Sequence, residues 1–324
     1  MAISSLYEFC RLCGHRCGIN RLKGKRGKCG LGPELLISSC TLHHGEEPFI
    51  SGARGSGTVF LSGCNLKCVY CQNYQISRIT APAVAAVDDS NAVNEYAVKG
   101  QAVKGHVDEI CSLLSSGAHN LNFVSPTSWI PDILDVLDAV RIQYPDVTAV
   151  YNTGGYDNPE YAELLCRHFQ VFLPDVKYAD SELAERYSGA GNYPEINKCF
   201  LKEIFSVHKT FNIEAGIMTR GICIRHLVLP GQIQNTLRVI DYIADTFGDN
   251  VYLSLMSQYT PMQIVSVPEE LRRPLRAEEY ETAVVYAEKA GLENVLIQEM
   301  ESAEVYTPDF TKSLPFTDGN TIAE

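Results

Sequence analysis

Short β-branched runs alternate with segments of helical periodicity along most of the 324-residue chain, and no other feature constrains the fold as strongly. The runs that predict strands span residues 58–61, 121–124, 147–151, 171–173, 223–229, 251–255 and 295–297. The segments that predict helices span residues 107–115, 130–143, 158–167, 195–208, 234–246 and 277–290. Strand-helix repetition of this kind predicts an α/β fold with a parallel sheet and right-handed crossovers, either doubly wound or closed toward a barrel.

The first predicted strand leads directly into a loop that carries three cysteines at the spacing Cys-x3-Cys-x2-Cys, namely Cys64, Cys68 and Cys71. In both architectures ligands bind at the carboxyl ends of the strands, so this loop lies where a site is expected. A cuboidal iron-sulfur cluster needs thiolate ligands, and a short loop that curls round one corner of the cube supplies three of them. The fourth iron is then left open, and a small molecule can bind and be activated there.

Zinc is the alternative at this loop, with Cys40, His43 or His44 as the fourth ligand. Zinc ligand pairs are usually spaced Cys-x2-Cys, and a triplet with one open corner is a less natural tetrahedral motif. The spacing therefore favours the iron-sulfur cluster.

A second cysteine group lies near the N-terminus and consists of Cys10, Cys13, Cys17 and Cys29. Its glycine-rich and lysine-rich surroundings hold too little apolar material for a core, so a metal is expected to organise the segment. Zinc and a second iron-sulfur cluster are both compatible with the spacing, and His15 could replace one cysteine. The predicted organisation is a cysteine-rich metal-binding module at residues 1–50, a main domain at 51–300 and a C-terminal tail at 301–324.

Residues 1–9 have neither the basic n-region nor the apolar stretch of a secretory signal, and no later segment approaches membrane-spanning length. These features predict a cytoplasmic protein without a membrane partner. In that reducing compartment the twelve cysteines are expected to be metal ligands and buried thiols. The cysteines expected to be small buried side chains are Cys111, Cys166, Cys199 and Cys223.

The net charge of −12 argues against nucleic acid as the main partner, because phosphate binding normally needs a basic surface. Residues 1–30 carry seven Lys or Arg against Glu8 alone, so this segment is +6 and the remainder is −12 − 6 = −18. A basic module on an acidic body could dock an acidic partner, or its charges could simply solvate a surface loop.

The cysteine spacing and its surroundings resemble the signature of the radical S-adenosylmethionine (SAM) superfamily. In that family the three cysteines hold a [4Fe-4S] cluster whose open iron chelates the amino and carboxylate groups of SAM. The aromatic residue before the last cysteine lies near the adenine, a position that Tyr70 fills.

Within that superfamily the chain is most similar to the activating enzymes of glycyl radical proteins, of the pyruvate formate-lyase type. The likeness runs from about Cys10 to about Phe310 and is greatest to an uncharacterised branch with an extra N-terminal cysteine module. It implies a partial (β/α)6 TIM-like barrel. The activases' Asp-Leu-Lys, which contacts the SAM ribose and carboxylate, is matched by Asp175-Val176-Lys177, and their Ile-Arg and Pro-Gly by Ile224-Arg225 and Pro230-Gly231.

Two family features are replaced in this sequence. Ser125-Pro126-Thr127 stands where the activases have the Gly-Gly-Glu that receives the SAM amino group, and Met256-Ser257-Gln258-Tyr259 stands where they have a histidine. The residues expected to bind SAM are Tyr70, Asn73, Ser125, Thr127, Asn152, Asp175, Lys177, Arg225, Met256 and Gln258. Several have structural alternatives, such as an ion pair between Asp175 and Lys177, an anchoring role for Arg225 or a turn capped by Asn152.

The resemblance implies an enzyme that reductively cleaves SAM to a 5′-deoxyadenosyl radical for hydrogen abstraction, with a flavodoxin or ferredoxin as electron donor. It implies no catalytic residue beyond the cluster ligands. The substrate would be a glycine of a glycyl radical enzyme, or alternatively another peptide, a metabolite or an RNA. A non-enzymatic zinc or iron-sulfur scaffold protein is the alternative from a different class.

Overall fold

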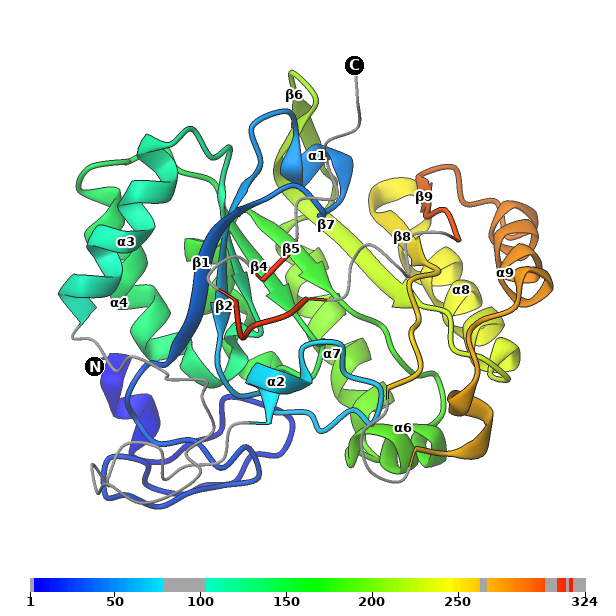
Figure 1. Ribbon diagram of the computed structural model, residues 1–324, viewed down its shortest axis with the longest axis horizontal. Coiled ribbons are helices and arrows are strands. Elements are labelled where there is room, and N and C mark those ends of the chain that lie inside the picture. The colour runs from blue at the N-terminus through cyan, green and yellow to red at the C-terminus, as the bar shows by residue number, and fades with distance from the viewer. Residues whose placement is uncertain (1–2, 79–102, 263–266, 301–307, 313–314, 317–324) are drawn as a thin grey trace.

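The central feature of the molecule is a mixed sheet whose main strands run parallel (Figure 1). The computed structural model describes residues 3–78, 103–262, 267–300, 308–312 and 315–316. In spatial order the strands are β1 (Ile37–His43), β2 (Ser56–Leu61), β3 (Leu121–Val124), β4 (Ala149–Thr153), β5 (Val171–Pro174), β7 (Ile217–Leu227), β8 (Tyr252–Met256) and β9 (Val295–Ile297). Strand β1 is antiparallel to β2, and from β2 to β9 each neighbouring pair is parallel.

The parallel strands follow one another in chain order, without the reversal that defines a doubly wound sheet. Of the two architectures that the sequence allows, this order favours the barrel type. The α/β fold with a parallel sheet is therefore confirmed, and its closure as a partial (β/α)6 barrel stays a prediction.

Helices flank the sheet on several sides, as Figure 1 shows, with α3 and α4 beside β1 and α8 and α9 beside β8. The longer helices are α3 (Val103–Ser115), α4 (Ile130–Arg141), α5 (Ala162–His168), α6 (Ser181–Ser188), α7 (Tyr193–Val207), α8 (Ile233–Phe247) and α9 (Ala277–Lys289). The short ones are α1 (Pro48–Ser51) and α2 (Tyr74–Ser77). On α4 the residues Ile133, Leu137 and Val140 recur at helical spacing and are buried, which explains why this segment forms a helix packed on the core. None of the helices in the described ranges is long and apolar enough to cross a membrane.

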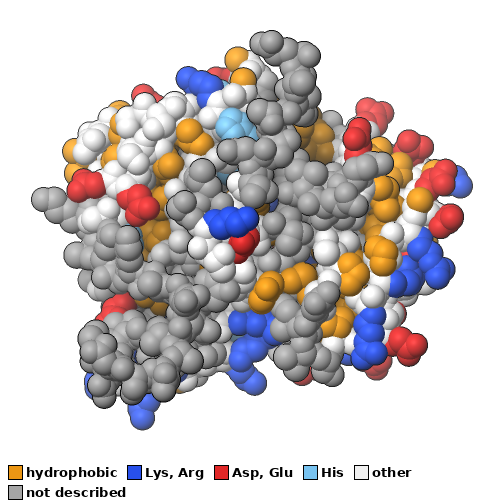
Figure 2. Space-filling model, viewed as in Figure 1, with side chains coloured by type: hydrophobic (Ala, Val, Ile, Leu, Met, Phe, Trp, Pro, Cys, Tyr) orange, Lys and Arg blue, Asp and Glu red, His pale blue; other side chains and the backbone are white. Residues whose placement is uncertain are grey.

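Strands β2 to β5 are buried along their whole length, because both of their faces are covered. Their largely apolar and β-branched runs were therefore recognisable in the sequence. Charged side chains gather instead on the outer helices, and Figure 2 shows many of them on the side where α9 lies. The sheet interior thus has few charged groups, and those it holds need a specific explanation.

The structure corrects several predicted elements. Strand β4 begins at Ala149, because Val147 lies in a turn and donates its N–H to Tyr144. Strand β7 begins at Ile217, six residues earlier than the predicted 223–229, and pairs with the unpredicted strand β6 (Asn212–Glu214). The turn between them uses positive φ angles at both Ala215 and Gly216, which suits a two-residue hairpin.

The N-terminal segment is attached to the main domain by a buried cation. Arg21 is only 1% exposed, and its guanidinium lies over the rings of Tyr7 and Trp129. The guanidinium also donates hydrogen bonds to the carbonyls of Gly32 and Ser128, at 2.9 and 2.6 Å. Arg21 is therefore part of a packing interface and does not solvate a surface loop, one of the two roles considered for the basic residues of this segment.

Two aromatic residues of the predicted C-terminal tail pack on the main domain. The tail, residues 301–324, is described only at 308–312 and 315–316. Within these parts, Phe310 and Phe316 contact the ring of Phe60 at centroid distances of 5.3 and 5.4 Å. The backbone N–H of Phe310 also donates to Gln75, so this part of the tail lies against β2 and α2.

Candidate functional site

The cysteine loop leaves the end of β2 and is held by backbone contacts along its length. Gly63 begins it at φ +78°, and a Cβ there would come within 2.5 Å of Leu31. Only glycine tolerates both this conformation and this close approach. The Asn65 amide then donates to the carbonyl of Tyr156 at 2.9 Å, and the N–H of Val69 donates to Tyr187 at 2.9 Å. The loop is thus fixed between the N-terminal segment and the α6 region.

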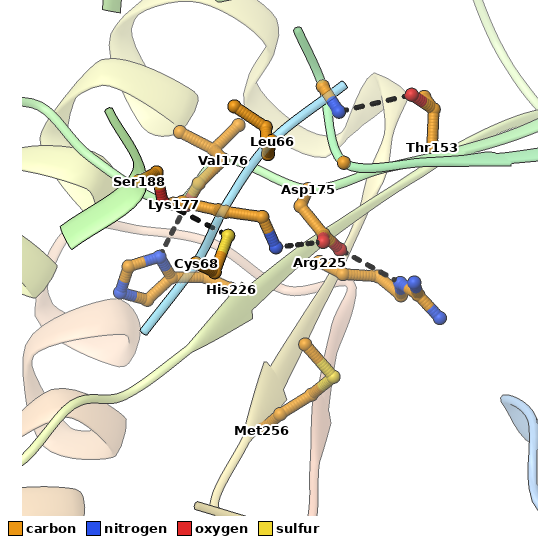
Figure 3. Close-up of polar contacts among 12 residues, drawn as sticks. Leu66, Cys68, Thr153, Asp175, Val176, Lys177, Ser188, Arg225, His226 and Met256 are labelled. Carbon is orange, nitrogen blue, oxygen red and sulfur yellow. Dashed lines mark hydrogen bonds and ion pairs between the residues drawn. The ribbon is translucent and has the colours of Figure 1, made fainter. Parts of the chain in front are cut away.

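The three thiols of this loop line one cavity of about 450 Å³. Each sulfur has a nearby polar partner: the N–H of Leu66 lies 3.4 Å from Cys64, the Ser188 hydroxyl 3.0 Å from Cys68 (Figure 3), and the Ser77 hydroxyl 3.3 Å from Cys71. Burial, with a smaller effect from the neighbouring Cys68 and Cys71 thiols, raises the pKa of Cys64 to about 12.

This donor set fits an iron-sulfur cluster. Three thiolates packed together without a metal repel one another, whereas iron binding compensates their charge and stabilises the thiolate form. Hydrogen bonds to the sulfurs are also a feature that tunes such clusters. No group of three or more His, Cys, Asp or Glu within the described ranges is arranged to hold a single metal ion. The thiolates of a cube bind separate irons, so they stand farther apart than the ligands of one ion.

The proposed fourth ligands of a zinc site are engaged elsewhere or lie outside the cavity. Cys40 and His44 do not line it. His43 does, but its ring packs on Phe316 at a centroid distance of 4.1 Å, and burial lowers its pKa to about 4. The geometry therefore favours the cluster over zinc at this loop.

The four N-terminal cysteines line a second, much smaller cavity of about 10 Å³. Burial, together with the smaller effect of the neighbouring thiols of Cys29, Cys10 and Cys17, raises the pKa of Cys13 to about 12. A metal at this set stays a prediction. His15 does not point to this set: its Nε2 atom lies 3.0 Å from the carbonyl oxygen of Asn65 in the cysteine loop.

A network of charges crosses the cavity beside the cysteine loop (Figure 3). Lys177 pairs with Asp175, and Asp175 also accepts a hydrogen bond from Nε of Arg225 at 3.2 Å. Arg225 donates in addition to Asn152 at 2.6 Å and to Glu46 at 3.3 Å. Burial would raise the pKa of Asp175, but Lys177 and Arg225 outweigh it and hold that pKa below its usual value.

Nine of the ten residues expected to bind SAM line this cavity together, namely Tyr70, Asn73, Ser125, Asn152, Asp175, Lys177, Arg225, Met256 and Gln258. Thr127 does not line it: its side chain is buried and its hydroxyl lies 3.2 Å from that of Thr153. Ser125 adopts a left-handed conformation at φ +61°, so the backbone at the end of β3 takes a shape that usually calls for glycine.

The sequence did not point to the two carboxylates that line the same cavity, Glu46 and Glu47. Glu46 accepts hydrogen bonds from Asn122 at 2.8 Å and Asn152 at 3.4 Å. Glu47 is 8% exposed, and its Oε2 atom has no hydrogen-bond partner among the described residues. Two adjacent acidic residues directly before Pro48 were the available signal.

No protein-family model matches the sequence. An uncharacterised protein of Methanocaldococcus jannaschii is 29% identical over 295 residues, which cover 89% of this chain and 77% of that protein. Among solved structures, Streptococcus suis SuiB bound to its precursor peptide SuiA aligns with a TM-score of 0.47 at 15% identity, and SuiB bound to S-adenosylmethionine with 0.47 at 14%. These alignments cover 75% and 76% of this chain but 48% and 49% of SuiB, so the chain spans about half the length of that protein.

Proposed function

We propose that this chain is a radical SAM enzyme. The observation that carries the proposal is that three thiols from one loop open onto the same cavity as a charged network at the ends of β5 and β7. When bound, a reduced [4Fe-4S] cluster supplies the electron that cleaves SAM to methionine and a 5′-deoxyadenosyl radical for hydrogen abstraction. The chain's own residues bind and orient the ligands of that reaction.

Cys64, Cys68 and Cys71 would hold three irons and leave the fourth open to the cavity. The Lys177 ammonium lies close enough to lower the pKa values of the Cys64 and Cys71 thiols, against the larger effect of burial. It would therefore offset part of the negative charge of three thiolates. Asp175 orients both Lys177 and Arg225, and this arrangement suits contacts to a ribose hydroxyl and a carboxylate.

The Tyr70 ring lines the cavity, and its hydroxyl lies 2.7 Å from that of Tyr178. This hydrogen bond fixes the ring where an adenine could pack on it. Amino-group recognition would fall to acceptors near Ser125, since the family's Gly-Gly-Glu is absent. The left-handed backbone at Ser125 suits such a role, because it turns the chain at the edge of the cavity.

Two substrate classes fit this chemistry: the glycine of a glycyl radical enzyme, as in the activases, and another peptide or a metabolite. The N-terminal cysteines would form a metal-binding module, with zinc or an auxiliary cluster, that buttresses the cysteine loop through His15 and Asn65. A flavodoxin or ferredoxin would deliver the electron.

Anaerobic reconstitution with iron and sulfide, followed by dithionite and SAM, tests the enzymatic function. We expect 5′-deoxyadenosine and methionine from the wild type and neither above background from Cys64→Ala. Cys111→Ala is the matched control, because Cys111 is buried on α3 outside the cavity and should leave turnover intact. A wild-type protein that binds iron but never forms 5′-deoxyadenosine would favour the scaffold alternative. A glycyl radical signal in a candidate partner would identify an activase, whereas a modified peptide or metabolite would identify the second class.

A further inference from the structure

The cavity has two chemically different ends. The cysteine loop follows Leu61 at the carboxyl end of β2, whereas Glu46 and Glu47 follow β1, whose last residue His43 pairs with Ser56 at the start of β2. A six-residue strand spans roughly 20 Å at about 3.3 Å per residue. The two carboxylates therefore enter the cavity from the opposite end of the sheet.

Four of the five charged side chains that line the cavity form ion pairs with one another, and the fifth, Glu47, forms none with any residue that the structure describes. Lys177, Asp175, Arg225 and Glu46 form a continuous series of alternating sign. Arg225 gives its hydrogen bonds to Asp175, Asn152 and Glu46, although it lies near Glu47 as well. The five charged side chains thus comprise two cations and three anions.

Among the described residues, Glu47 is the one of these three anions without a hydrogen-bonded cation, although the nearby Arg225 charge lowers its pKa against the larger effect of burial and Ser254 lies within reach of its carboxylate. It is more than nine-tenths buried and lines the cavity, and its Oε2 atom accepts no hydrogen bond from any residue that the structure describes. A buried carboxylate in this condition is costly, and buried acceptors are nearly always paired in native proteins. Aliphatic walls from Pro48, Leu296 and Ile297 line the same cavity.

We propose that Glu47 receives a positively charged nitrogen of the substrate, a primary ammonium or guanidinium on an aliphatic stem. A cation bound at this end forms an ion pair with the Glu47 carboxylate, and the aliphatic stem of the substrate packs on Pro48, Leu296 and Ile297. This inference rests on the proposed function in one respect: the amino group of SAM is taken to bind at the cysteine end, which leaves the Glu47 end for a second molecule. The substrate class is accordingly an aliphatic amine, including a lysine-like or arginine-like side chain.

Equilibrium dialysis of the anaerobically reconstituted full-length protein with radiolabelled n-butylamine tests this assignment. We expect Glu47→Gln to weaken binding by about tenfold or more, in line with a charge-assisted contact in a buried site. Glu281→Gln is the matched control, because this exposed residue on α9 changes the net charge by the same amount. Glu47→Asp should retain part of the affinity, and n-butanol, the neutral isostere, should not compete.

S-adenosylhomocysteine, measured in the same way, distinguishes the two sources of a cationic nitrogen. Its affinity should be equal in the wild type and Glu47→Gln. A parallel loss for both ligands would assign Glu47 to the amino group of SAM and overturn the substrate site, as would equal n-butylamine binding by the wild type and Glu47→Gln. The absence of 5′-deoxyadenosine would refute the radical function and leave these binding results standing, so the two failures are distinguishable.

Discussion

Replacing Arg225 by methionine tests whether the charge network holds the centre of the sheet together. The Arg225 side chain is 17% exposed and pairs with Asp175 at 3.2 Å and Glu46 at 3.3 Å. Each contact is worth roughly 5 kcal/mol of Coulomb attraction at an effective dielectric constant of about 20, most of it offset by desolvation. Removing one partner of a buried pair leaves the other charge uncompensated, so we expect a loss of about 3–5 kcal/mol.

Urea denaturation followed by circular dichroism measures this loss. With a slope near 3 kcal/mol per M, the midpoint should fall by roughly 1–1.7 M. The control is Arg238→Met, which removes the 3.6 Å contact with Asp180 on the exposed surface and should cost less than about 1 kcal/mol. The reasoning is refuted if Arg225→Met shifts the midpoint no more than this control does.

The pH dependence of the stability difference between the wild type and Arg225→Met is a second check. Because Lys177 and Arg225 hold the folded pKa of Asp175 below its unfolded value, its pairing stabilises the protein above the unfolded pKa of about 3.9. This stability is lost as the pH falls through the folded pKa. The gap between the wild type and Arg225→Met should therefore be widest near neutral pH and narrow below roughly pH 4.

Three further changes have expected outcomes. Burial raises the folded pKa of Glu47, so this carboxyl stabilises the fold below the unfolded pKa of about 4.3, and the stabilisation is lost as the pH rises through the folded pKa. The melting temperature of Glu47→Gln should therefore exceed that of the wild type at pH 8 and equal it at pH 4. Gly155→Ala should lower the free energy of unfolding by well over the roughly 1–2 kcal/mol of a left-handed alanine, since its Cβ would lie 2.1 Å from the Asp175 carbonyl oxygen. Gly189→Ala, which has open space around its Cβ, should lower it only by that amount, and thermal unfolding measures both. Arg21→Met removes the donor of the Gly32 carbonyl, at about 1–3 kcal/mol, and leaves the Ser128 carbonyl only the longer contact with the Tyr7 hydroxyl at 3.4 Å, so limited proteolysis should cut the N-terminal segment faster, with no change in the surface variant Arg26→Met.

Much of the fold was predictable because burial and periodicity coincide along the chain. Strands β2 to β5 are covered on both faces, so their apolar and β-branched residues stand out in the sequence although Asn122 and Asn152 lie among them. Helix α6 escaped recognition because it is short and largely polar, although its ends carry the usual signals: Asp180 accepts from Leu183, and Gly189 ends the helix at φ +65°. Strand β6 is short and partly exposed, and its turn places Ala215 where glycine or asparagine would have been the sequence signal.

Some residues of the candidate site could be recognised from local sequence patterns, whereas others could be found only from the tertiary fold. Cysteine spacing is local, so Cys64 to Cys71 could be found without a structure, and the rule that ligands lie at strand ends led to Asp175 and Arg225. That rule failed for Thr127, because Pro126 begins a 3-10 turn that directs the threonine hydroxyl to Thr153.

The rule could not find Glu46 or Glu47 at all, because both follow the antiparallel strand β1 and so begin at the amino ends of the parallel strands. Only the tertiary fold brings Glu46 across to Asn122, Asn152 and Arg225 and places Glu47 in the same cavity. Arg225 compensates the charge of Glu46, but the second carboxylate, Glu47, adds negative charge to a cavity that would already hold three thiolates, which is unfavourable without a further cation. If Glu47 served stability alone, a neutral side chain of similar size would serve better. The retained charge therefore argues that the far end of the cavity was shaped by its ligand.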